Sequence, residues 1–253
     1  DDAYILFGYV RRFVAGEGIV FYPGGPHAEG ATDFLWFLAL AALHRLGIDV
    51  ALAACFLNAA GGALLGGLLA RTLVRSKALL GLLVPAALAG AAIAAVIGFG
   101  SLFFSAAAAW ALVLSIEAIE GGPRAGPAIL AIPFVGLLLA LIRPDGVVLG
   151  AGFVLVAGLV LGAQTAALRE RCGRPFVIRA LLAAAVGAVY FAWRWSYFGL
   201  ALPLPLYVKG HAARELSGTA MLAGVSSVGG WLLHPVGGWP LLLALVLVLA
   251  IGG

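Results

Sequence analysis

The sequence predicts an all-α protein, a polytopic bundle of membrane-spanning helices, and two observations predict it. Of the 253 residues, 64% are hydrophobic and only 10% are charged, and the mean hydropathy is +1.13. Soluble domains are about 45–50% apolar and about 25% charged, so a soluble fold of this length could not bury so much apolar surface. The apolar residues also come in runs of about 20, the length that an α-helix needs to cross a bilayer.

A more polar stretch, residues 1–48, comes before these runs, and we expect it to form an outer loop. It begins with an amphipathic segment in which Ile5, Tyr9 and Phe13 recur at helical spacing. A Gly- and Pro-rich loop follows. Residues 33–46 are then apolar but too few for a crossing, so they predict an interfacial helix within this loop.

Seven apolar runs between residues 49 and 253 predict the membrane spans. They lie near residues 49–73, 79–98, 102–119, 127–142, 146–165, 179–198 and 236–253. Ala and Gly are frequent in them, and small residues allow helices to pack closely in lipid. The chain opens without Met and stops within the last run. We therefore expect a single membrane domain over residues 1–253, truncated at both ends.

Basic residues predict how the bundle is oriented. One cluster contains Arg71, Arg75 and Lys77. The second lies in a predicted loop and contains Arg169, Arg171, Arg174 and Arg179. The positive-inside rule puts both clusters in the cytoplasm, and the even number of predicted spans between them agrees with that. The net charge of +4 is thus explained by topology and does not indicate nucleic-acid binding.

With this orientation, three polar segments share the outer face: residues 1–32, the turn at 143–146, and residues 199–217. The acidic pair at positions 1 and 2 could cap a helix, or could supply a general base with an acidic helper. Arg143 lies in a Pro-Asp-Gly turn, which is ordinary turn chemistry, but its guanidinium group also suits a phosphate.

The third outer segment follows an aromatic-rich helix end, which is typical of a membrane interface. Arg194, near that end, is expected to extend its charge to the interface. Pro203 and Pro205 predict an extended stretch that presents Tyr207 and Lys209. A single Lys in a loop is most often only solvated, so the shared face of the three segments is the stronger signal.

Five motifs in these segments carry a resemblance. They are Asp1-Asp2-Ala3-Tyr4-Ile5, Arg11, Glu29-Gly30-Ala31-Thr32-Asp33-Phe34-Leu35-Trp36, Arg143-Pro144-Asp145-Gly146, and Leu202-Pro203 with Tyr207 and Lys209. In this order they resemble the GT-C superfamily of membrane glycosyltransferases, and most closely bacterial enzymes of the terminal arabinofuranosyltransferase type, which use polyprenyl-phosphate sugars. The resemblance spans nearly the whole chain and predicts that it is part of a larger GT-C fold.

The resemblance implies transfer of a sugar from a polyprenyl-phosphate donor to an acceptor hydroxyl, with inversion, at the extracytoplasmic face of a bacterial plasma membrane. The family uses an aspartate of the acidic pair as base, so Asp1 is the expected base and Asp2 its helper. Arg143, Lys209 and Arg11 are expected to bind the donor phosphate. The sugar or acceptor site is expected to be lined by Tyr4, His27, Glu29 and Tyr207. Arabinofuranose, mannose and other hexoses remain open as the sugar, and a glycan, lipid or protein as the acceptor.

Two alternatives remain open. The first is a non-catalytic, lipid-binding subunit with a GT-C fold, favoured because residues 100–104 carry no acid where the family usually has one. The second is a lipid or sugar transporter, but few charges are predicted at the bilayer midplane, where transporters bind their substrates. No cofactor is expected, although His27, Glu29 and the acidic pair could together hold one divalent cation.

Overall fold

A computed structural model describes residues 2–30, 32–73 and 98–200. The regular structure in these ranges is α-helical, which confirms the predicted all-α class. The helices are α1 (Asp2–Val14), α2 (Phe34–Arg45), α3 (Val50–Leu73), α5 (Ser101–Glu120), α6 (Ala125–Ile142), α7 (Gly146–Ala163) and α8 (Ala166–Phe198).

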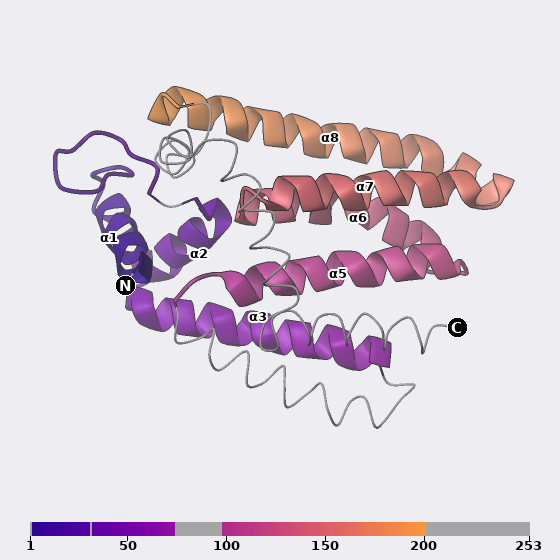
Figure 1. The fold of residues 1–253 in the computed structure, drawn as a ribbon, viewed down its shortest axis with the longest axis horizontal. Coiled ribbons are helices and arrows are strands. Elements are labelled where there is room, and N and C mark those ends of the chain that lie inside the picture. Colours follow the sequence, from indigo (N-terminus) through magenta and orange to yellow (C-terminus); the bar gives the residue numbers. More distant parts are fainter. Residues whose placement is uncertain (1, 31, 74–97, 201–253) are drawn as a thin grey trace, which may run out of the picture. The chain divides into compact units, whose positions relative to one another are not determined.

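Five of these helices, α3, α5, α6, α7 and α8, are long and apolar enough to cross a membrane. They lie side by side, with α1 and α2 at one end of them (Figure 1). This arrangement agrees with a membrane helical bundle and with five of the seven predicted spans. The predicted spans 79–98 and 236–253 lie outside the described residues. At 12 residues α2 is too short to cross, and its interfacial position stays a prediction.

The longest helix, α8, has 33 residues and begins earlier than the sequence predicted. The Thr165 hydroxyl accepts a hydrogen bond from the backbone N–H of Leu168, which caps the helix start. Residues 166–171 read Ala-Ala-Leu-Arg-Glu-Arg, and each of these residue types favours helix. The arginines that were expected in a loop therefore lie on α8 itself. The helix ends at Phe198 and is followed by Gly199, whose φ of 72° is the left-handed conformation that favours glycine.

The helices α6 and α7 make a close backbone contact. A Cβ atom added to Gly150 would collide with the carbonyl oxygen of Gly136, and one added to Gly136 would lie 3.0 Å from the carbonyl oxygen of Gly150. Small residues at this crossing thus let the two backbones touch, as in many membrane bundles. Around it, Ile129, Ile132 and Leu139 of α6 are fully buried in the core of the bundle.

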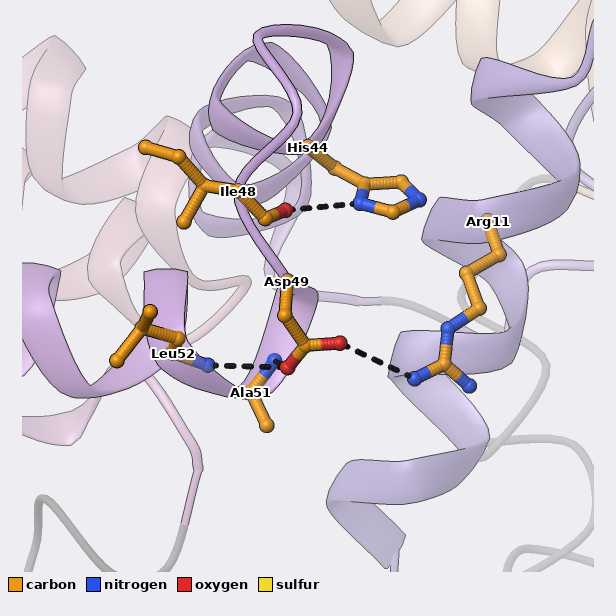
Figure 2. Close-up of polar contacts among 6 residues, drawn as sticks. All are labelled: Arg11, His44, Ile48, Asp49, Ala51 and Leu52. Carbon is orange, nitrogen blue, oxygen red and sulfur yellow. Dashed lines mark hydrogen bonds and ion pairs between the residues drawn. The ribbon is translucent and has the colours of Figure 1, made fainter.

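A second core joins α1, α2 and the start of α3. The buried residues of α1 are Ala3, Leu6, Phe7, Tyr9 and Val10. The face expected from Ile5, Tyr9 and Phe13 was therefore only partly right, because Ile5 and Phe13 are exposed. The turn from α2 to α3 is closed by a 2.9 Å hydrogen bond between Nδ1 of His44 and the carbonyl of Ile48 (Figure 2).

The helices α5, α6, α7 and α8 each have one end near α1 and α2. Before α5, an added Cβ on Gly98 would lie 2.9 Å from the Cβ of Ala3, and Gly100 packs on the ring of Trp36. The turn between α6 and α7 and the end of α8 lie at this same end of the helices (Figure 1). We call this region, which comprises the loop 15–33, the turn 143–146 and residues 194–200, the polar end of the bundle, because His27, Glu29 and Arg143 lie there.

Candidate functional site

Glu29, in the loop between α1 and α2, is paired with Arg194 near the end of α8. Nε of Arg194 donates to Oε1 of Glu29 at 2.6 Å, and Nη2 of Arg194 donates to Oε2. Both residues are 4% exposed. Nη1 of Arg194 also donates to the carbonyl of Leu200 at 3.3 Å. The expectation that Arg194 extends to the interface was wrong, because a two-pronged bond to a carboxylate holds it inside the protein.

The same loop packs on α8 through His27, whose ring is stacked on that of Tyr197 with centroids 4.1 Å apart. The hydroxyl of Tyr197 accepts a 3.0 Å hydrogen bond from the backbone N–H of Ile19. Next to it, Gly18 has a φ of 84°, and an added Cβ would lie 2.9 Å from this hydroxyl. His27 itself is exposed. The loop therefore fixes His27 at the surface of the polar end.

Arg143 follows α6 in the short turn before α7. Its Nε donates to Oδ1 of Asp145 at 3.0 Å, and its guanidinium carbon lies 5.5 Å from the centre of the Phe104 ring. The hydrogen bond to Asp145 raises the pKa of Arg143, so its charge is secure. Within the described ranges, its two terminal nitrogens donate to no protein acceptor. The side chain is 36% exposed and can reach a ligand.

Asp33 lies beside this turn and was not singled out from the sequence. It precedes the first residue of α2, but its carboxylate makes no capping hydrogen bond. The residue is 9% exposed, and Oδ1 accepts only a long bond, 3.4 Å, from the hydroxyl of Thr32. Burial raises the pKa of Asp33, while the nearby charge of Arg143 lowers it. An Asp directly before an apolar helix usually indicates a cap, which is why its pattern gave no functional signal.

Arg11, the third expected phosphate ligand, is directed toward Asp49 at the start of α3 (Figure 2). Its Nη2 lies 3.8 Å from Oδ2 of Asp49, and both side chains are more than half exposed. Asp49 caps α3, because Oδ1 accepts from the backbone N–H groups of Ala51 at 2.9 Å and Leu52 at 3.3 Å. These bonds, led by the one from Leu52, lower the pKa of Asp49.

The remaining predicted site residues are placed only in part. Tyr4 is 67% exposed on α1, with its ring edge against Phe7. Asp2 is the first residue of α1, and nothing is described of its side chain. Asp1, Tyr207 and Lys209 lie outside the described residues. The structure thus brings His27, Glu29 and Arg143 to the polar end. It gives both carboxylate oxygens of Glu29 a protein partner.

An apolar groove of about 740 Å³ runs between α6, α7 and α8. Small residues line much of it, among them Ala140, Gly150, Ala184 and Gly187. Leu141 and Val147, which flank the turn of Arg143, also line it. So does Tyr190, whose ring lies 4.6 Å from that of Phe34, the neighbour of Asp33. The groove therefore reaches the two residues that flank the turn of Arg143, and its wall contacts the residue after Asp33.

The described ranges contain no group of three or more His, Cys, Asp or Glu side chains that could hold a metal ion. Comparison with known proteins adds no further lead, since no family model, curated protein or solved structure matches this chain. The resemblance to GT-C glycosyltransferases accordingly stays a prediction from the motifs.

Proposed function

We propose that this protein transfers a sugar from a polyprenyl-phosphate donor to an acceptor hydroxyl at the outer face of the membrane. The observation that carries the proposal is that Leu141 and Val147, on either side of the turn that holds Arg143, line the apolar groove. A lipid phosphate is apolar along its chain and anionic at its head. The groove offers a lipid-like surface to the chain, and the guanidinium group at its end suits the phosphate.

The surroundings of Arg143 support this role. Asp145 holds Nε, which leaves both terminal nitrogens for the oxygens of a phosphate. Phe104 lies against the guanidinium group and restricts its orientation. The lipid phosphate is a leaving group that is already stable as an anion. A fixed cation beside it is therefore the main stabilisation that the reaction requires on that side. We assign Lys209 and Arg11 as further cations for the same phosphate.

The proposed reaction is a single displacement. The oxygen of the acceptor hydroxyl forms a bond to the anomeric carbon while the bond from that carbon to the phosphate oxygen breaks. The electron pair leaves with the phosphate, and the hydroxyl proton passes to the carboxylate of Asp1, with Asp2 orienting the base or the acceptor. Tyr4, His27 and Tyr207 line the sugar or acceptor site. Glu29 contributes by holding the loop of His27 in place through Arg194.

The proposed setting is a bacterial plasma membrane, with the active face outside and a glycan, lipid or protein of the cell envelope as acceptor. The test uses the intact protein in liposomes with a panel of polyprenyl-phosphate sugars and a cell-envelope extract as acceptor source. Release of free polyprenyl phosphate is measured for wild type and for Asp1→Asn. Release that the substitution abolishes supports the proposal. Donor binding without release from the folded wild type would instead support a non-catalytic lipid-binding subunit.

A further inference from the structure

Asp33 and Asp49 occupy equivalent positions before two successive helices but behave differently. Asp49 is exposed and caps α3 through the backbone N–H groups of Ala51 and Leu52 (Figure 2). Asp33 is buried and gives the start of α2 no side-chain hydrogen bond. A capping carboxylate usually accepts from the second or third residue of its helix. The carboxylate of Asp33 therefore does not serve to cap α2.

The described residues give this carboxylate few hydrogen bonds. Oδ1 accepts a long bond from Thr32, and Oδ2 accepts no hydrogen bond from the described residues. A charged carboxylate that is buried with so few partners disfavours the folded state, as the raised pKa of Asp33 also indicates. Ionisable groups that disfavour the folded state in this way are concentrated in functional sites.

The position of Asp33 indicates its ligand. Arg143 acts on its charge from the turn between α6 and α7, and the next residue, Phe34, packs against Tyr190 in the wall of the groove. The residue after Asp33 thus contacts the groove wall at Tyr190, and Arg143 lies in the turn between two residues of that wall, Leu141 and Val147. Arg143 can only donate hydrogen bonds, which suits phosphate oxygens, whereas ionised Asp33 can only accept them, which suits hydroxyl groups.

We propose that Asp33 binds hydroxyl groups of the sugar in the lipid-linked donor whose phosphate is held by Arg143. This inference rests on the proposed function and adds a residue to its donor site. The groove holds the chain, Arg143 holds the phosphate, and Asp33 holds the sugar. The carboxylate has two oxygens and can accept from two neighbouring hydroxyls, so it recognises the sugar and contributes nothing to the binding of a bare lipid phosphate.

The test compares the affinity of two lipids for the intact protein in nanodiscs: polyprenyl phosphate and the same lipid carrying its sugar. Asp33→Asn should weaken binding of the sugar-bearing lipid about tenfold or more, because hydrogen bonds to a charged group are lost, and should not weaken binding of the bare lipid, whose phosphate a carboxylate repels. Arg143→Gln should weaken both. Glu170→Gln removes a charge from an exposed position on α8 and should change neither.

Each other outcome is decisive. Unchanged binding of the sugar-bearing lipid to Asp33→Asn, or equal weakening of both lipids, overturns the role of Asp33 while the proposed function stands. Failure of Asp33→Asn to fold, judged by its thermal unfolding, would show that the residue is structural and also overturn the inference. If the wild type binds neither lipid, the proposed function fails and the inference fails with it.

Discussion

The carboxylate of Glu29 and the guanidinium group of Arg194 form a buried, two-pronged pair between residues 165 positions apart in the sequence. The pair joins the loop after α1 to the end of α8, and the stacked rings of His27 and Tyr197 strengthen the same junction. It thereby fixes one side of the polar end, where we place the acceptor.

We expect the Glu29–Arg194 pair to matter strongly for the free energy of unfolding. Glu29→Ala leaves a buried guanidinium group without its carboxylate and should lower the free energy of unfolding by about 3–5 kcal/mol. The measurement is thermal or denaturant unfolding in detergent. Arg124→Gln breaks a looser pair with Glu117, in which the Arg124 side chain is 73% exposed, and should cost less than about 1 kcal/mol. Equal effects of the two substitutions would contradict a special role for the buried pair.

Asp33 and Asp49 should affect the pH dependence of stability in opposite directions. Burial raises the pKa of Asp33, so its contribution to stability is complete below the unfolded pKa of about 3.9 and is lost as the pH rises through the folded value. Hydrogen bonds lower the pKa of Asp49, so its contribution is present above about 3.9 and is lost as the pH falls through the folded value.

Melting temperatures measured across this pH range check both signs. Asp33→Asn should remove the loss of stability with rising pH, and at neutral pH it should be at least as stable as the wild type. Asp49→Asn keeps a capping side chain but removes the charge, so it should remove the loss at low pH. Similar pH profiles for the two variants would contradict the assignment.

The contact between α6 and α7 should not tolerate a side chain at Gly150. Gly150→Ala would push the carbonyl of Gly136 away and should destabilise the fold by about 1–3 kcal/mol. Gly152 lies on the same helix with no atom within 4 Å of an added Cβ. Gly152→Ala should therefore be neutral, or stabilising by up to about 1 kcal/mol through helix propensity. Unfolding of both variants in detergent gives the comparison.

Filling the groove should block the lipid chain. Ala184 lines the groove, whereas its neighbour Ala185 is exposed and does not. Ala184→Trp should reduce the affinity for a polyprenyl phosphate about tenfold or more, since a large ring would occupy the space of the chain, and Ala185→Trp should leave it unchanged. Lipid binding in nanodiscs measures the difference, and equal affinities would place the lipid elsewhere.

Lysine should replace Arg143 poorly. Arg143→Lys keeps the charge but loses the planar fork that can meet two phosphate oxygens and stay bonded to Asp145. We expect kcat/KM for the polyprenyl-phosphate donor to fall about tenfold or more, with the melting temperature little changed because the pair with Asp145 is exposed. Unaltered kcat/KM in the liposome assay would remove Arg143 from the phosphate site.

The sequence by itself determined the all-α class and the positions of α3, α5, α6 and α7 to within a few residues. Membrane spans are readable in this way because each must be apolar over a length that the bilayer fixes. The start of α8 was harder to predict, because the helix extends beyond the apolar run into a stretch of polar residues that resembles a loop in composition.

Only the tertiary structure decided which polar groups meet. Glu29 and Arg194 are 165 positions apart in the sequence, and hydrophobic periodicity carries no information about such partners. Asp33 and Asp49 show the limit most clearly, because both precede an apolar helix and only one caps it. Tertiary packing made the difference, because it leaves Asp33 only 9% exposed but the side chain of Asp49 59% exposed.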